Sequence, residues 1–142
     1  MIFSSQFHDH YEFVVQDIFK KTAGAYQIQF GDWVYVGKSN DIRRRWMQWM
    51  FAIRTKKGLN DSFAQLLSSY KGIIHFSILE KIPKKKYTDA ELSYLEYKYF
   101  FKYKVKNRKL LNKADVWKPK DYQLSDAPPI FLELPDTLNA SE

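Results

Sequence analysis

Residues 24–37 read GAYQIQFGDWVYVG, and before Gly31-Asp32 the side chains of Tyr26, Ile28 and Phe30 alternate with those of Gln27 and Gln29. An alternation with a period of two predicts a strand with one solvated face, and Trp33-Val34-Tyr35-Val36 after the turn is the returning strand. Gly31-Asp32 places glycine first in a two-residue connection, as a type II′ turn requires. The stretch therefore predicts a β-hairpin with strands over residues 25–30 and 33–36.

The register of this hairpin follows from its turn, which places Tyr26 opposite Gly37 and Ile28 opposite Tyr35. Tyr26 and Tyr35 then share a face as diagonal neighbours, roughly 7–8 Å apart. Gly37 has no side chain, so we expect a space opposite Tyr26 in which a ligand could approach the backbone. Taken alone, two tyrosines in this arrangement are more simply explained as an aromatic cross-strand cluster.

Hydrophobic spacing over the rest of the chain predicts further helices and one more strand, and thus an α/β (α+β) fold. The expected strand covers residues 73–82. The expected helices cover residues 4–20, the segment from a cap at Ser39 or Asn40 to Gly58, residues 63–70, and the segment that runs from the Thr88-Asp89-Ala90-Glu91 capping box through Tyr103. We expect three parts: an N-terminal helix (1–22), a central domain (23–114) and an acidic C-terminal arm (115–142).

Composition narrows the class of protein. A length of 142 residues fits one domain, and the absence of Cys excludes disulfides, thiolate zinc sites and a cysteine nucleophile. No apolar run approaches the ~18–20 residues of a membrane span, and we see no secretory signal, so we expect a cytoplasmic protein with no membrane partner.

Charge is distributed unevenly along the chain. All 23 basic residues lie at or before Lys120, whereas residues 121–142 hold five acids and no base. Residues 1–120 therefore carry 23 basic and 11 acidic side chains, an excess that attracts polyanions. Each basic cluster could equally be a solvated face, but several clusters of one sign favour a nucleic-acid partner.

Two further residues are candidates for chemistry. Arg45 borders the apolar stripe of its helix and can reach back over the hairpin, although a solvated arginine is the simpler interpretation. Glu96 lies four residues after Leu92 and four before Phe100, at the border of an apolar face. A carboxylate there needs hydrogen bonds or a cation, and the cation can be a nearby lysine or a hard divalent metal.

The order of these motifs is specific. It consists of Gly24-Ala25-Tyr26, Tyr35-Val36-Gly37, Arg45-Trp46, Glu96 and Asn112. In this order the chain resembles the GIY-YIG nuclease family, over about residues 23–114. The resemblance implies a small three-stranded antiparallel sheet flanked by helices, and metal-dependent hydrolysis of nucleic-acid phosphodiesters.

The resemblance also implies roles for single residues. Glu96 would be the sole protein ligand of one Mg²⁺ or Mn²⁺ per active site, and Arg45 would hold the scissile phosphate. Tyr26 and Tyr35 would line the attack side, with Tyr35 favoured as the group that activates water, and Asn112 would position the phosphate or the Glu96 loop. Basic residues expected to contact nucleic acid are Lys38, Arg43, Arg44 and Lys71.

The chain departs from the family pattern at two positions. Ala25 replaces the isoleucine of the first tripeptide, where only a strand filler is needed. Many members carry a histidine one turn after the arginine, and Trp49 stands at that position here. A proton-transfer role for that histidine is therefore absent or moved.

We expect a restriction-like or phage-type endonuclease that acts on DNA, most simply double-stranded. One active site per chain would favour a homodimer or higher homo-oligomer for cutting both strands. The alternative is a non-catalytic module on the same fold that binds nucleic acid or a protein partner. Residues 121–142 could occupy the basic groove and restrain activity, or could simply form a solubilising arm.

Overall fold

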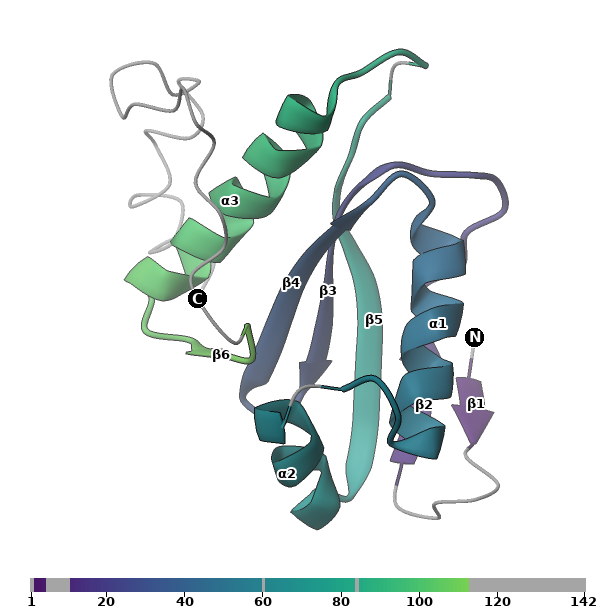
Figure 1. The fold of residues 1–142 in the computed structure, drawn as a ribbon, viewed down its shortest axis with the longest axis vertical. Helices are drawn as coiled ribbons and strands as arrows, with labels where there is room; N and C mark the ends of the chain where they lie inside the picture. Colours follow the sequence, from purple (N-terminus) through teal and green to yellow (C-terminus); the bar gives the residue numbers. More distant parts are fainter. Residues whose placement is uncertain (1, 5–10, 60, 84, 113–142) are drawn as a thin grey trace.

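The computed structural model describes residues 2–4, 11–59, 61–83 and 85–112, and these have a mixed α+β architecture (Figure 1). The helices are α1 (Ile42–Thr55), α2 (Asp61–Ser69) and α3 (Asp89–Val105). The strands are β1 (Ile2–Ser4), β2 (Tyr11–Val15), β3 (Gly24–Phe30), β4 (Trp33–Ser39), β5 (Gly72–Lys81) and β6 (Lys109–Leu110). Of the helices in the described ranges, none is long and apolar enough to cross a membrane.

The strands form one six-stranded sheet in the order β1-β2-β5-β3-β4-β6. At its centre β3 pairs antiparallel with both β4 and β5, whereas β2 runs parallel to β5 and β6 parallel to β4. The expected three-stranded antiparallel sheet was therefore too small. The strands that widen it come from outside the hairpin region, from the N-terminal segment and from the residues after α3.

The hairpin follows its predicted register. Phe30 pairs with Trp33, Ile28 with Tyr35 and Tyr26 with Gly37. Gly31 adopts φ +58°, a conformation that glycine reaches at little cost and that a primed turn requires. The two-residue turn fixes this register, and a shift by one residue would move every side chain of a strand to the other face of the sheet.

The predicted N-terminal helix over residues 4–20 is wrong. Ser4 belongs to β1, and Tyr11–Val15 form β2, in which alternate side chains are buried. Tyr11, Val14, Val15 and Ile18 have helical spacing, but Tyr11, Phe13 and Val15 also fit a period of two. Parallel pairing with β5 decides between the two patterns, because it buries Phe13 completely against Phe76. This pairing makes β2 part of the same sheet as the hairpin.

Helices cover both faces of the sheet (Figure 1). Residues of α1 and α2 pack on the face that carries Tyr26, Ile28 and Phe30, and form the larger apolar core with them. A smaller core on the opposite face joins Val34 and Val36 of β4 to α3. The central strands are therefore held between two layers.

The helix ends differ slightly from the predicted ones. Asp41, and not Ser39 or Asn40, is the N-cap of α1, and Lys56 ends this helix in the left-handed conformation two residues before Gly58. The Thr88–Glu91 capping box of α3 is confirmed in both of its hydrogen bonds. The arm over residues 115–142 lies outside the described residues.

Candidate active site

Tyr26 lies at the centre of the site. Its side chain is 1% exposed, and its hydroxyl oxygen accepts a hydrogen bond from the Trp49 indole nitrogen at 2.9 Å. Trp46 packs edge-on against the Tyr26 ring at 6.1 Å between centroids. The aromatic stripe of α1 thus fixes this phenol on the sheet.

The space that we expected opposite Tyr26 is filled by Tyr26 itself. A Cβ atom added to Gly37 would lie 2.5 Å from Cζ and 2.6 Å from the hydroxyl oxygen of Tyr26. Glycine is needed at position 37 so that the phenol can lie across the backbone of β4. The prediction of an open approach for a ligand at this point was wrong.

Tyr35 lies beside Tyr26 on the same face, as the register predicted. The two ring centroids are 6.5 Å apart with an interplanar angle of 42°, and the Tyr35 ring also contacts Trp49 at 4.9 Å. Unlike Tyr26, Tyr35 is only partly buried. Of the two phenols, Tyr35 is therefore the more accessible to solvent.

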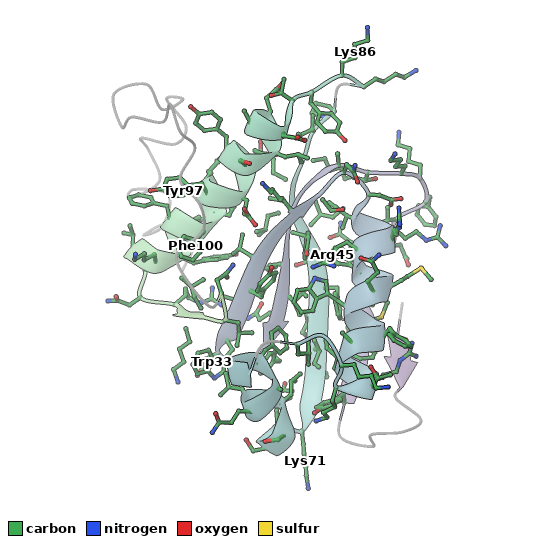
Figure 2. All side chains as sticks on the ribbon, in the orientation of Figure 1. Trp33, Arg45, Lys71, Lys86, Tyr97 and Phe100 are labelled. Carbon is green, nitrogen blue, oxygen red and sulfur yellow. The ribbon has the colours of Figure 1, made fainter. Side chains whose placement is uncertain are left out.

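Arg45 reaches this aromatic cluster from the first turns of α1. Its guanidinium lies over the Trp49 ring, 5.3 Å from the centroid, and donates a hydrogen bond to Gln48 Oε1 at 3.1 Å. Figure 2 shows Arg45 between α1 and the central strands. The residue itself is exposed, and a hydrogen bond between its guanidinium and the Tyr26 hydroxyl lowers the pKa of that phenol.

Glu96 approaches from α3 and is partly buried. Within the described residues it makes no hydrogen bond or ion pair. The nearest cation that influences it is Lys38, whose ammonium group donates to Ser93 Oγ at 2.7 Å, one turn earlier on α3. Glu96 is thus a carboxylate in a half-buried position with no direct protein partner among these residues.

The pKa shifts of these groups show that they share one environment. Burial raises the pKa of Glu96, and the positive charge of Lys38 opposes this rise. Burial also raises the pKa of Tyr26 and of Tyr35, the negative charge of Glu96 raises both further, and the positive charge of Arg45 lowers both. The Trp49 hydrogen bond lowers the pKa of Tyr26.

Asn112 braces the outer edge of β4. Its side-chain amide accepts from the Val36 backbone N–H at 3.2 Å and donates to the Val36 carbonyl at 2.9 Å. It therefore extends the contact of β6 with β4 from Val34, where the strand pairing ends, to Val36. Its bonds hold the strand between Tyr35 and Gly37, a positioning role that differs from the expected contact with a phosphate or the Glu96 loop.

The structure brings together five of the nine predicted residues, places Asn112 at the edge of β4 and leaves three elsewhere. Tyr26, Tyr35, Arg45, Glu96 and Lys38 interact with one another through the charges and contacts described above. Arg43 lines an apolar cavity with Val15 and Met47, away from the phenols. Arg44 is exposed, and Lys71 lies before the start of β5 at the far end of the sheet (Figure 2).

Two contributors were missed in the sequence. Trp49 was interpreted as part of the apolar stripe of its helix and as the residue that replaces the family's histidine, and Ser93 was not considered. The spacing could have indicated both residues. Trp49 follows Arg45 by four residues and Ser93 precedes Glu96 by three, so each pair shares a helix face.

The donor set for a metal ion is small. No group of three or more His, Asp or Glu side chains that could hold an ion occurs in the part of the chain that the structure describes. Glu96 alone supplies a carboxylate to the cluster of Tyr26, Tyr35 and Arg45 within that part. A hard cation bound here would need water and a ligand's oxygen atoms to complete its coordination.

Comparison of the chain with protein-family models, with curated proteins and with solved structures found no match.

Proposed function

We propose that this protein is a divalent-metal-dependent nuclease that hydrolyses phosphodiester bonds of DNA, of the GIY-YIG type that its motifs resemble. The observation that carries the proposal is the environment of Glu96. This half-buried carboxylate lacks a direct partner among the described residues, yet it shares one electrostatic environment with Tyr26, Tyr35 and Arg45. Such a group is available to bind a cation, and Arg45 is available to bind a phosphate.

The residues present fit one Mg²⁺ or Mn²⁺ held by Glu96, water and substrate oxygens. Such an ion would supply charge neutralisation at a phosphate oxygen and at the leaving 3′ oxygen. Arg45 would bind the scissile phosphate with the donors that Gln48 does not use. Lys38, held by Ser93, would add a second positive charge next to the same phosphate.

The two phenols would have different tasks. Tyr26 is buried and accepts the Trp49 hydrogen bond, so it would hold the neighbouring side chains of the site in place. Tyr35 is the more exposed phenol and would orient the attacking water. Burial raises the pKa of Tyr35, so deprotonation would require the positive charges of Arg45 and the bound cation.

Cleavage of supercoiled plasmid in Mg²⁺ or Mn²⁺ tests the proposal. We expect wild-type protein to cut, and Glu96→Ala and Arg45→Ala to lose cutting. Arg44→Ala is the matched control, because it removes a neighbouring arginine from another side of α1. Equal cutting by wild type and Glu96→Ala would refute the proposed mechanism.

A second candidate function is a non-catalytic nucleic-acid-binding module. The raised pKa of both phenols favours it, because a phenol of raised pKa is a poor general base at neutral pH. Tight binding of DNA with no turnover in Mg²⁺, Mn²⁺ or Ca²⁺ would establish this function in place of the first.

A further inference from the structure

A basic cleft of about 580 Å³ lies at the end of the sheet where β3 begins and β5 ends. Four lysines from three segments line it: Lys20, Lys21, Lys81 and Lys85. All four are exposed, none makes a hydrogen bond or ion pair through its side chain within the described residues, and no Asp or Glu lines the cleft. The cleft therefore presents positive charge that the described protein does not neutralise.

The backbone below these lysines is tied in place. The Ile82 N–H donates to the Ala23 carbonyl at 2.8 Å, which joins the end of β5 to the segment before β3. The Ile42 N–H donates to the Thr22 carbonyl at 2.9 Å, which joins that segment to the start of α1. These bonds tie the end of β5, which carries Lys81, and the segment that follows Lys21 to the sheet and to α1.

The cleft adjoins the candidate active site. Asn40 lines it and follows Lys38 by two residues, and Tyr87 lines it and precedes the N-cap of α3, the helix that carries Glu96. Figure 1 shows that α1 and α3 both begin at this end of the sheet. From the start of α3 to Glu96 is about two helix turns, on the order of 10 Å, a span of a few nucleotides along one strand.

We propose that this cleft binds backbone phosphates of the nucleic acid on one side of the bond that is cut. The inference rests on the proposed function for its ligand, and extends it by a separate binding site. Ammonium groups are compact point charges that contact phosphates without reading sequence. The cleft would therefore position the strand and add affinity, while leaving the chemical step to Arg45 and Glu96.

The test compares two charge-matched double variants in a Glu96→Gln background that does not cut. Lys81→Gln/Lys85→Gln removes two charges from the cleft. Lys57→Gln/Lys109→Gln removes two from the opposite end, where Lys57 follows α1 and Lys109 pairs with Trp33. The probe is a short fluorescein-labelled DNA duplex, and its dissociation constant is measured by anisotropy over a series of salt concentrations.

We expect the cleft variant to bind more weakly, with the slope of log K against log salt smaller by about 0.9 for each phosphate that the cleft no longer neutralises. The Lys57→Gln/Lys109→Gln control should lose only the general attraction that two positive charges exert on DNA. Equal losses in both variants would overturn the cleft as a site. Cleft-dependent binding of polyglutamate, without cleft-dependent binding of DNA, would also overturn it and indicate an acidic peptide as the ligand.

The same variants with Glu96 restored separate this inference from the proposed nuclease activity. We expect the cleft variant to raise KM for plasmid while kcat stays within about twofold. Cleft-dependent binding by a wild-type protein that never cuts would support the cleft and refute the nuclease. Cutting that depends on Glu96, with KM unchanged in the cleft variant, would refute the cleft and support the nuclease.

Discussion

Two regions of this protein contain the same kinds of side chain in different arrangements. One holds Glu80 with Lys98, Tyr99 and Tyr103, and the other holds Glu96 with Lys38, Tyr35 and Tyr26. Around Glu80 the groups bond to each other: Lys98 and Tyr99 both donate to its Oε1 at 2.8 Å. Around Glu96 the lysine bonds to Ser93 instead, and neither phenol donates to the carboxylate.

The comparison separates a structural cluster from a candidate site. The Glu80 cluster continues through Tyr103, which donates to Gln27 at 2.6 Å, and it satisfies the polar groups between α3 and the sheet. The Glu96 cluster leaves its carboxylate without a hydrogen bond or ion pair among the described residues, and its arginine is exposed. A network with its bonds complete stabilises the fold, whereas one with charged groups left over is ready for a ligand.

The largest expected effect is on cleavage. Glu96→Gln should reduce cleavage of plasmid DNA at least about 100-fold, because Lewis-acid stabilisation of a phosphoryl transition state is worth several kcal/mol. Glu80→Gln should leave cleavage within about threefold, since its bonds are internal to the fold. Initial rates at saturating Mg²⁺ measure both. Similar losses in the two variants would show that the clusters do not differ in function.

The second effect concerns the packing of Tyr26 over Gly37. Gly37→Ala should destabilise the protein by about 1–3 kcal/mol, because its Cβ would overlap the Tyr26 ring. Urea denaturation measures the loss. In a Tyr26→Val background the same substitution should cost much less. An equal cost in both backgrounds would mean that the strain lies in the backbone and not in the phenol.

The third effect is on stability, where the two carboxylates should respond with opposite signs. Burial raises the pKa of Glu96 above its ordinary value of 4.5, so the folded state binds its proton more tightly than the unfolded state. The free energy of unfolding therefore falls as the pH rises from 4.5 through the raised pKa of Glu96. Glu96→Gln removes this effect and should raise Tm at pH 7. The gain should vanish below about pH 4, where both states hold the proton.

Glu80→Gln should instead lower stability. It removes the charge opposite Lys98, whose side chain is 9% exposed, and weakens two hydrogen bonds. The expected loss is about 1–2 kcal/mol, a low value for an ion pair because the Glu80 side chain is 37% exposed. Differential scanning calorimetry of the two variants between pH 4 and 8 compares them directly. A fall in Tm for Glu96→Gln at neutral pH would indicate that its carboxylate has a protein partner.

Only part of the fold could be predicted from the sequence. The hairpin and its register were predicted because a two-residue turn and a period of two act over a few neighbouring residues. The N-terminal strand was not, because Tyr11–Val15 fits two periods and its pairing partner begins at Gly72, far along the chain. A non-local parallel partner leaves no local mark in the sequence.

The candidate site shows the same limit. Its titratable residues were predicted from motifs, but Glu80 and Glu96 are both acidic residues at the border of an apolar face. Glu80 is bonded because Lys98 reaches its carboxylate, whereas Lys38 bonds to Ser93 and not to Glu96. Tertiary packing decides both outcomes. The bond between Trp49 and Tyr26 likewise joins residues that lie 23 positions apart.

The smallest expected effect tests that bond. Trp49→Phe and Tyr26→Phe should each cost about 1 kcal/mol or more in stability, and the double variant should cost less than their sum. Urea denaturation of the four proteins gives the coupling energy, for which we expect about 0.5–1.5 kcal/mol.

The matched cycle in the other cluster uses Tyr103→Phe and Gln27→Leu, whose side chains share the 2.6 Å bond. Because both bonds are internal, the two cycles should give similar energies, although only the Trp49 and Tyr26 variants should also slow cleavage, through the displaced or missing Tyr26 phenol. Additive costs for Trp49 and Tyr26 would remove the hydrogen bond as the reason for the position of this phenol.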